Sequence, residues 1–306
     1  MNDSMKSYPE YAARPAQLKR ITLAIQSGVE ALQRSQLQNG AFPFSQRQSD
    51  GSWQACHPIF STVTVLLCIG KLLPGSDVQR AIDYVVTCRE SDGLWDYDPG
   101  MDIPADSDTV ACALAALSNY APDLIEQSDS DLLLSVLRPD GVFLTWYSDE
   151  DRWQLQARDD AVMNCNVIYA LSMMGCHVTD HTIEAIAKLI QRSTTGSRYY
   201  TQRCMLAYAA VRAGFDLTEI PEELTTQAMF EDSPLSVAQS ICAGIPPNEE
   251  AIPILLDTQC ADGLWPAQPW CTGEGLEPWG SNAVTTAFCL EALNLLVTTP
   301  NSTHDD

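Results

Sequence analysis

The chain has few basic residues for its length. It carries 17 lysines and arginines against 40 aspartates and glutamates in 306 residues, which gives a formal net charge of −23 at pH 7. A surface with this charge repels the phosphates of nucleic acids and of anionic membranes. We therefore expect no nucleic-acid partner, and we read the charge as that of a highly soluble protein.

Long apolar runs are also missing. No segment approaches the roughly 18 consecutive apolar residues that a membrane-spanning helix needs. The N-terminal stretch MNDSMKSYPEYAARP has no apolar signal core. These two absences predict a cytoplasmic protein without stable membrane insertion.

Histidine is scarce, with 4 residues, whereas cysteine is not, with 11. The cysteines are odd in number and most lie inside apolar stretches, as Cys68, Cys112 and Cys289 do, so we expect reduced thiols packed in the core. Cysteine and histidine are adjacent at Cys56-His57 and at Cys176-His177, and no spaced set of these residues matches a zinc site. We predict no bound metal.

Patterns typical of β-strands are weak throughout the chain. Stretches with one apolar face alternate instead with stretches that are apolar on all sides. A helix of the first kind needs one wet face, whereas a helix of the second kind needs full burial. The expected amphipathic helices span about residues 17–36, 76–89, 124–137, 179–192, 221–230 and 247–259. The expected apolar helices span about residues 59–73, 106–119, 159–174, 200–213, 234–243 and 281–297.

Six helices of each kind predict an all-α (α/α)6 toroid, a double-ring α-barrel in which an outer ring of helices surrounds an inner ring. An open helical superhelix is the competing architecture. We expect residues 1–15 to form an N-terminal arm, residues 16–297 to form a single barrel domain, and residues 298–306 to be a disordered tail.

A turn sequence recurs between the two kinds of helix. A glutamine or arginine is followed four residues later by glycine and six residues later by an aromatic residue in three places, residues 36–42, 89–95 and 259–265. Gly141-x-Phe143 keeps the last part of this spacing, and the tetrapeptide Asp-Gly-Leu-Trp occurs at both 92–95 and 262–265. Such self-similarity indicates a repeat architecture.

All seven tryptophans fall in the connections that lead from an outer to an inner helix. In a toroid these connections gather on one face, so we expect them to rim a central cavity. Trp95 and Trp265 belong to the repeated turn and are expected mainly to fasten it to a neighbouring helix. The other aromatic residues are predicted to border a site for an apolar or cationic ligand. They are Trp53, Tyr97, Trp146, Trp153, Trp270 and Trp279.

An acidic cluster, Asp106-Ser107-Asp108-Thr109, opens the second apolar helix. Such residues suit a helix start because their side-chain oxygens accept hydrogen bonds from the free N–H groups of the first turn. The cap accounts for one carboxylate and leaves the other to be explained. From the residues alone, a capping Asp106 beside a solvated Asp108 is as good an explanation as a pair of active-site acids.

The turns, the alternating helices and the Asp-x-Asp-Thr cluster resemble the squalene cyclase and prenyltransferase repeat family, over roughly residues 17–297. The cluster is similar to the Asp-x-Asp-Asp motif of class II terpenoid cyclases, whose middle aspartate protonates an alkene or an epoxide. The resemblance implies that Asp108 is this acid, that Asp106 is its flanking partner, and that Thr109 stands where many members have a third aspartate. Two features depart from the family: Val110 leaves the Thr-Thr form of the motif incomplete, and the chain has length for one toroid where class II cyclases usually have two.

Such chemistry needs a carboxylic acid that stays protonated in a dry pocket, with aromatic faces around the cation that forms. Burial and a neighbouring carboxylate raise the pKa of such an acid, whereas a helix N-terminus favours its anion. The sequence leaves this balance open for Asp108.

A second polar group occupies the corresponding position of the third apolar helix. Asp160 follows Asp159 and shares a helical face with Asn164 at spacing i, i+4. These residues are predicted to form a second polar wall of the pocket, and helix capping with a buried polar contact is an equally good interpretation. Met163 stands where an Asp-Asp-x-x-Asp magnesium motif needs its last acid.

We therefore expect a class II terpenoid cyclase-like enzyme, an isomerase or lyase that acts on an isoprenoid or isoprenoid-bearing substrate without a cofactor. Magnesium is expected only if the substrate carries a diphosphate. Such a group could be held by arginines of the mouth loops, for which ordinary ion pairing is the other role: Arg47, Arg152, Arg158 and Arg198. The alternatives are another natural-product cyclisation, prenyl transfer or hydration in the same cavity, and a non-catalytic isoprenoid-binding or partner-docking toroid. A homodimer or second subunit that closes the cavity is left open.

Overall fold

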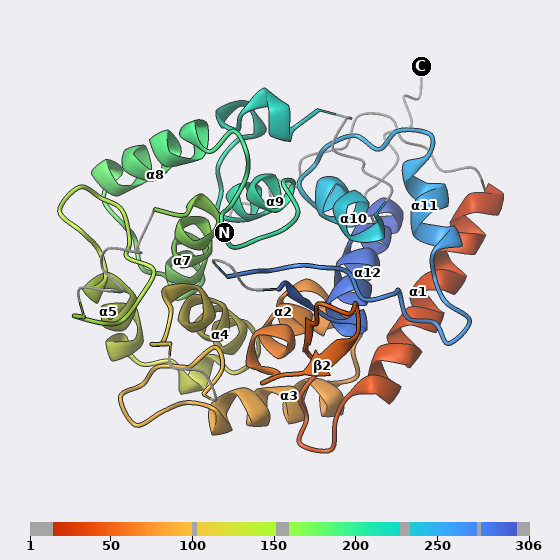
Figure 1. Cartoon of the computed structure of the whole chain (residues 1–306), viewed down its shortest axis with the longest axis horizontal. Coiled ribbons are helices and arrows are strands. Elements are labelled where there is room, and N and C mark those ends of the chain that lie inside the picture. Colours follow the sequence, from red (N-terminus) through yellow and green to blue (C-terminus); the bar gives the residue numbers. More distant parts are fainter. Residues whose placement is uncertain (1–14, 100–102, 151–158, 227–232, 274–276, 299–306) are drawn as a thin grey trace.

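The computed structural model describes residues 15–99, 103–150, 159–226, 233–273 and 277–298. Helices in the described chain alternate between an outer and an inner position (Figure 1). The outer helices are α1 (Pro15–Ser35), α3 (Gly75–Thr87), α5 (Gln127–Ser135), α8 (Asp180–Arg192) and α11 (Ala251–Asp257). The inner helices are α2 (Ile59–Ile69), α4 (Ser107–Tyr120), α7 (Ala161–Met173), α9 (Met205–Arg212), α10 (Pro234–Cys242) and α12 (Asn282–Thr298).

The inner helices form a closed ring. Each packs against the next along the chain, from α2 through α4, α7, α9 and α10 to α12, and α12 packs back against α2 (Figure 1). An open superhelix has no such contact between its first and last inner helices. The predicted all-α toroid is therefore confirmed.

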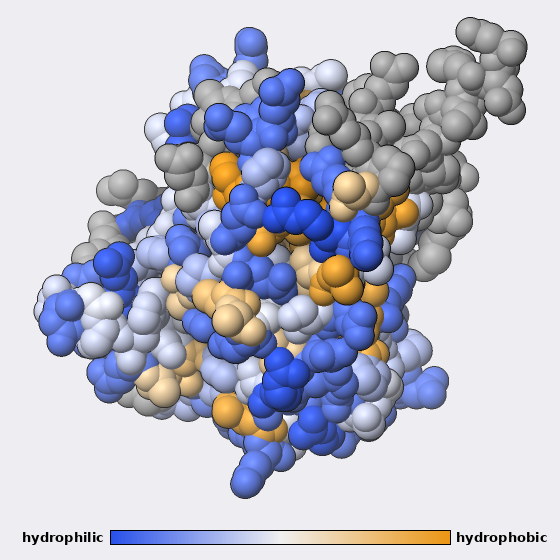
Figure 2. All heavy atoms as spheres, turned by 90° about the vertical axis from the view of Figure 1, so that its right-hand side faces the viewer, coloured by the Kyte–Doolittle hydropathy of each residue, from blue (hydrophilic) through white to orange (hydrophobic). Residues whose placement is uncertain are grey.

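Burial separates the two rings as the sequence pattern requires. Every residue of α4 from Ser107 to Leu117 is buried, whereas α8 buries only the stripe of Thr182, Ile186, Leu189 and Ile190. The outward faces of the outer helices are polar. The side of the molecule that carries α1 and α11 is largely hydrophilic, with small separate apolar patches (Figure 2).

The fifth outer position differs from expectation. The sequence predicts a helix over residues 221–230, but the described part of this segment holds only the 3-10 turn η4 (Glu222–Leu224), preceded by η3 (Leu217–Glu219). The turn ends at Thr225, and two β-branched threonines in succession favour helix poorly. Leu224 is fully buried and anchors the described part of the segment to the core. The end of the predicted helix lies outside the described residues.

Two further 3-10 turns, η1 (Gly70–Leu72) and η2 (Pro122–Leu124), follow inner helices. A small antiparallel sheet has the order β2–β1–β3, with β1 (Ser45–Arg47), β2 (Trp53–Ala55) and β3 (Trp279–Gly280). Ser45 pairs with Gly280, so the sheet joins the connection before α2 to the connection before α12. It fastens together two loops on the face where the inner helices begin.

The repeated turn has a repeated set of hydrogen bonds. Gln36 and Gln259 each donate from Nε2 to the carbonyl of the glycine four residues later, at 2.8 Å in both cases. Arg89 donates from Nε to the carbonyl of Gly93 at 3.1 Å. The long polar side chain thus closes the turn, which explains why arginine can replace glutamine in this position.

The tryptophan of the turn fastens it to the preceding outer helix, as expected for Trp95 and Trp265. The ring Nε1 of Trp95 donates to the carbonyl of Val85, and that of Trp265 donates to the carbonyl of Leu255, both at 2.7 Å. Both rings are fully buried.

A second repeated contact joins each turn to the inner ring. The backbone N–H of the turn's aromatic residue donates to a polar side chain on the following inner helix, at 2.9 Å in three repeats. The pairs are Phe42 with Thr62, Phe143 with Asn164, and Trp265 with Thr286. Asn164 therefore occupies the position that threonine holds in two other repeats.

Of the predicted arm and tail, only Pro15, which starts α1, and Thr298, which ends α12, lie among the described residues. All eleven cysteines are free thiols. Within the described residues, none of the helices has the length and apolar character that crossing a membrane requires.

Candidate active site

The connections that lead into the inner helices meet around a cavity of about 250 Å³. This volume lies just below the roughly 300–1,000 Å³ typical of small-molecule sites. The lining residues come from the starts of several inner helices and from the loops before them. They are Phe60, Tyr97, Ile103, Asp106, Asp108, Thr109, Thr145, Trp146, Met163, Arg198, Tyr199, Tyr200, Cys271, Thr272, Gly273 and Trp279.

Aromatic rings make up much of the cavity wall, and they pack mainly edge to face. The ring centroids of Tyr97 and Trp279 lie 5.6 Å apart at 85°, and those of Phe60 and Tyr97 lie 5.7 Å apart at 62°. Trp146 and Tyr199 form a further pair at 6.3 Å. A wall of ring faces suits an apolar ligand and also a developing positive charge.

Asp106 caps α4. Its Oδ1 accepts from the backbone N–H of Thr109 at 2.7 Å, and its Oδ2 accepts from the hydroxyl of Thr109 at 2.8 Å. The residues before α4 also pair with the loop that carries Trp146, because Ser107 N donates to the carbonyl of Thr145 at 2.8 Å. This pairing brings the Trp146 ring to the cavity.

Asp108 lies in the first turn of α4 and is 8% exposed. Asn166 of α7 donates from Nδ2 to Asp108 Oδ1 at 2.7 Å, and the hydroxyl of Tyr200 donates to Asp108 Oδ2 at 2.7 Å. The carboxyl is therefore held from two sides, by Asn166 of α7 and by Tyr200 of the loop before α9.

Burial raises the pKa of both carboxyls. The pKa of Asp106 rises to about 6, chiefly because burial disfavours the anion, although the donors of Thr109 oppose the rise. The pKa of Asp108 rises to about 7, first through burial and second through the charge of Asp106, and the donors of Asn166 and Tyr200 oppose it. The balance that the sequence leaves open thus falls on the side of a raised pKa for Asp108.

The polar contacts continue from Asp108 through the inner ring. Arg212, at the end of α9, donates from Nη2 to Asn166 Oδ1 at 2.6 Å and from Nη1 to the hydroxyl of Tyr208 at 3.5 Å. Tyr208 in turn donates to Glu291 of α12 at 3.0 Å. Four inner helices are thereby joined by one chain of polar side chains.

Six of the sequence-predicted site residues line the cavity together: Tyr97, Asp106, Asp108, Thr109, Trp146 and Trp279. Trp270 lies one layer behind, stacked on the Phe60 ring at 4.9 Å and 24°, and is 1% exposed. Trp53 belongs to β2 and is not part of the lining, because it pairs with Arg47 in the sheet. Trp153 lies outside the described residues.

Asp160 and Asn164 do not form a second polar wall of this cavity. Asp160 caps α7 through the N–H of Met163 at 3.0 Å, and its other oxygen accepts from Ser197 Oγ at 2.7 Å and from Arg198 N at 2.9 Å. It thereby holds the loop that carries Tyr199 and Tyr200. Asn164 binds the turn at Phe143 instead of facing the cavity.

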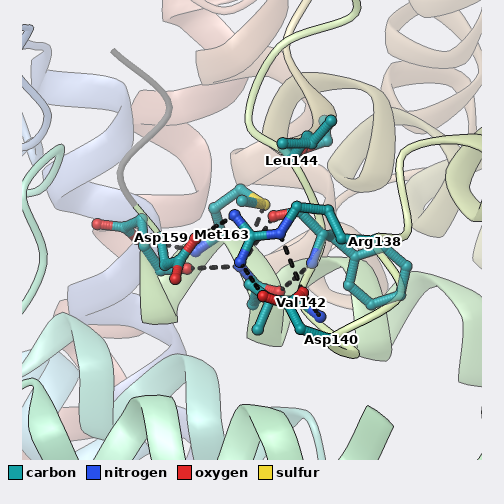
Figure 3. A network of polar contacts seen from close by, with 10 residues as sticks. Arg138, Asp140, Val142, Leu144, Asp159 and Met163 are labelled. Atoms are coloured by element: carbon teal, nitrogen blue, oxygen red, sulfur yellow. Dashed lines mark hydrogen bonds and ion pairs between the residues drawn. The ribbon is translucent and has the colours of Figure 1, made fainter. Parts of the chain in front are cut away.

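Asp159 points away to a surface ion pair. Arg138 donates from Nη1 to Asp159 at 2.7 Å and from Nη2 to Asp140 at 2.6 Å (Figure 3). Among the described residues, no cluster of three or more histidine, cysteine or acidic side chains has the arrangement of a metal site.

Sequence reasoning missed several residues around Asp108. Tyr200 and Asn166 supply its hydrogen bonds, and Met163 lines the cavity; Arg198, one of the mouth-loop arginines named from the sequence, also lines it. The available signals were the adjacent aromatic residues Tyr199-Tyr200 directly before an inner helix, and an asparagine inside the otherwise apolar stretch that follows Asp160.

No family model matches the sequence, and no curated protein is similar to it. Solved structures are similar in fold. The type II terpene cyclase MstE from Scytonema in complex with geranylgeranyl dihydroxybenzoate, its substrate, has a TM-score of 0.69 and 14% identity over 93% of this chain and 99% of that one. MstE has also been solved with merosterolic acid A, its product, with a TM-score of 0.70 and 14% identity over 93% of this chain and 99% of that one.

Two other solved structures are also similar in fold. The ent-copalyl diphosphate synthase from Streptomyces platensis has a TM-score of 0.55 and 15% identity, and the match covers 81% of this chain and 52% of that one. A glycosidase has a TM-score of 0.54 and 13% identity over 94% of this chain and 100% of that one. The fold is thus that of the type II terpene cyclases, and the chemistry must be argued from the cavity.

Proposed function

We propose that this protein is a class II terpenoid cyclase-like enzyme in which Asp108 protonates an isoprenoid substrate. The observation that carries the proposal is a buried carboxyl with a pKa raised to about 7 that faces a cavity lined by aromatic rings. An acid with this pKa is about half protonated at neutral pH, so it can start each turnover without a metal ion.

The first step transfers the proton of Asp108 to a carbon of a carbon–carbon double bond. The O–H bond breaks, a C–H bond forms, and positive charge develops on the neighbouring carbon. Asn166 and Tyr200 already donate to the two oxygens of Asp108 and stabilise the carboxylate that is left. The rings of Phe60, Tyr97 and Trp279 present π-faces and edges that can accommodate the cation.

The cation then closes one or more rings by reaction with further double bonds of the same chain. Loss of a proton from the last cation gives a product that is an isomer of the substrate. The substrate class is therefore a polyunsaturated isoprenoid chain, either free or attached to a head group.

Polar residues of the lining can hold such a head group. Arg198, Thr272 and Gly273 line the cavity, and the backbone N–H of Thr272 donates to the carbonyl of Tyr199, the residue after Arg198. The fold likeness to MstE, which binds geranylgeranyl dihydroxybenzoate, supports an isoprenoid chain on an aromatic acid as the first candidate. The likeness to a copalyl diphosphate synthase supports a prenyl diphosphate as the second.

Glycoside hydrolysis, the activity of another structure with this fold, fits the site less well. It needs two carboxylates that flank the sugar and act separately. Both oxygens of Asp106 are engaged by Thr109, and aromatic rings line much of the cavity. A non-catalytic isoprenoid-binding toroid is also less well supported, because it gives no role to a buried carboxyl whose hydrogen-bond donors, among the described residues, are the neutral groups of Asn166 and Tyr200.

The test is turnover of a panel of isoprenoids by the purified protein, with geranylgeranyl dihydroxybenzoate and geranylgeranyl diphosphate assayed with and without a chelator. Product mass identifies the reaction: an unchanged mass indicates cyclisation, a gain of one water indicates hydration, and loss of diphosphate indicates transfer or ionisation.

Asp108→Asn removes the acidic proton but can keep both contacts, because its amide oxygen can accept from Asn166 and its NH2 group can donate to Tyr200. Turnover is expected to fall at least ~10²-fold, the lower end for positioned proton transfer. Asp106→Asn is expected to cost less, because Asp106 caps the helix and tunes the acid. The matched control is Asp159→Asn, which alters a partly exposed ion pair at a residue that does not line the cavity. Activity of Asp108→Asn within a few-fold of wild type contradicts the proposal.

A further inference from the structure

The neighbours of Asn166 allow its side-chain amide only one of its two flips, that is, one choice of which neighbour the oxygen faces and which the NH2 group faces. Its Oδ1 lies 2.6 Å from a guanidinium nitrogen of Arg212, and its Nδ2 lies 2.7 Å from Asp108 Oδ1. A guanidinium has donors and no acceptor, so the atom that faces it must be the amide oxygen. The NH2 group then has to face Asp108.

This orientation makes the two oxygens of Asp108 unequal. The NH2 group of Asn166 can only donate, so Oδ1 must act as an acceptor there. The hydroxyl of Tyr200, which contacts Oδ2 at 2.7 Å, can donate or accept. When Asp108 carries a proton, a position of that proton on Oδ2 is therefore compatible with these contacts.

Arg212 is itself held in place. Its guanidinium lies over the ring of Tyr169 at 4.7 Å and over the ring of Tyr208 at 5.0 Å. The Tyr208 hydroxyl, which Arg212 contacts, donates to Glu291. Arg212 is not part of the cavity lining, and its hydrogen bond to Asn166 links it to a donor of Asp108; Cys112, whose Sγ lies 4.0 Å from Asp108 Oδ1, is a second neighbour of that oxygen.

We infer that Arg212 is a positioning residue for the candidate acid: it locks the Asn166 amide so that Asn166 donates to Asp108 Oδ1 and Oδ2 becomes the proton-donating oxygen. The chain Arg212–Asn166–Asp108 cannot carry protons inward, because the guanidinium and the amide keep theirs. Its role is to fix geometry and charge. The catalytic meaning of this inference rests on the proposed function, whereas its test needs no substrate.

The pKa of Asp108 is the quantity to measure. It can be followed by NMR of protein labelled with 13C at the aspartate carboxyls, with the Asp108 signal assigned from its loss in Asp108→Asn. The other titratable groups around this carboxyl lie on α4, on α7 and in the loops before α9 and β3. They are Asp106, Cys112, Asp160, Cys165, Tyr200 and Cys271.

Asn166→Leu keeps the approximate shape of the side chain and removes the donor. Because a donor stabilises the anion, its loss is expected to raise the pKa of Asp108 by about 1–2 pH units, the range for a hydrogen bond to a charged group. Arg212→Met frees the amide to turn and is expected to raise the same pKa by a smaller amount. Arg138→Met, which removes an arginine bound to two carboxylates away from the cavity, is the matched control and should leave it unchanged.

The deciding measurement is the double variant. If Arg212 acts through Asn166, then Arg212→Met adds nothing to the pKa rise in the Asn166→Leu background. An additional rise there means that Arg212 acts directly by its charge, and an unchanged pKa in Arg212→Met alone means that it does not position Asn166; either result overturns the inference. Arg212→Gln gives the same cycle if Arg212→Met does not fold. Because no turnover is measured, a failed cyclase assay leaves this result intact.

Discussion

The raised pKa of Asp108 predicts how the free energy of unfolding changes with pH. Testing this prediction needs no substrate. A carboxyl whose pKa is higher in the folded than in the unfolded chain keeps its proton on folding, so unfolding releases a proton at intermediate pH. Below about pH 4 both the folded and the unfolded chain hold the proton, so the free energy of unfolding is not reduced. As the pH rises from the unfolded pKa to the folded one, stability falls, and above the folded pKa the loss is complete.

The size of the loss follows from the two pKa values. The pKa of Asp108 rises from 3.8 to about 7. At about 1.36 kcal/mol per unit, Asp108 destabilises the fold by about 4 kcal/mol once it is ionised, to order of magnitude. Asp108→Asn stays neutral and escapes this loss. The variant that loses activity is therefore expected to be more stable than wild type at alkaline pH.

The assay is urea unfolding of wild type and Asp108→Asn at pH 5.5 and pH 8.5. Both pH values lie above the sequence pI of about 4.3, the pH at which solubility is lowest. Any fixed cost of burying an amide cancels when the two pH values are compared. The stability advantage of Asp108→Asn is expected to grow by about 2 kcal/mol between them.

A matched variant, Asp159→Asn, loses a partly exposed ion pair with Arg138 and should show no such pH-dependent gain. An advantage of Asp108→Asn that stays constant with pH would refute the reasoning. It would mean that Asp108 titrates in its ordinary range and cannot be held as a protonated acid near neutral pH.

Two further predictions concern the cavity wall and the repeated turn. Tyr200→Phe keeps the ring but removes the donor to Asp108 Oδ2, so we expect the alkaline limb of the pH–rate profile to move upward and kcat to fall roughly 10–100-fold; a limb that moves downward contradicts this. Gly263→Ala should destabilise the fold by at least ~1–3 kcal/mol in urea unfolding, because φ is +95° and a Cβ would lie 2.6 Å from the carbonyl oxygen of Ser27. Gly51→Ala, with φ of +85° and nothing within 4 Å, separates backbone strain from this clash and should cost less.

The architecture could be predicted because its determinants are local. Gln259 closes its own turn onto Gly263, four residues away, and the Trp265 ring reaches back ten residues to Leu255. Each repeat therefore carries its fold in its own sequence. The helix predicted over residues 221–230 was wrong in its described part for the opposite reason. The burial of Leu224 holds this part in place, and a helical pattern does not.

The site could be predicted only in part, because its members are far apart in the chain. Asp106 and Asp108 form a visible cluster, but Asn166 and Tyr200 lie 58 and 92 positions from Asp108. Each is a single polar group without a spacing that marks it. Counting tryptophans in the mouth loops was also a weak guide, because the loops have two layers: Trp279 faces the cavity, whereas Trp270 packs behind Phe60.

Asp106 and Asp108 lie two residues apart, and the groups that their oxygens contact explain why their roles differ. Asp106 takes the hydrogen bond that a helix start offers, through the N–H of Thr109, and its pKa reaches only about 6. Asp108 contacts Asn166 and Tyr200 instead, so the amides of the first turn give its anion no direct hydrogen bond. Asp106 thus accepts the hydrogen bond from the start of the helix. Because Asp106 does so, Asp108 can stay protonated in the same first turn. A charged Asp106 also raises the pKa of its neighbour, so the capping residue helps to keep the proton on the acid that we propose for the site.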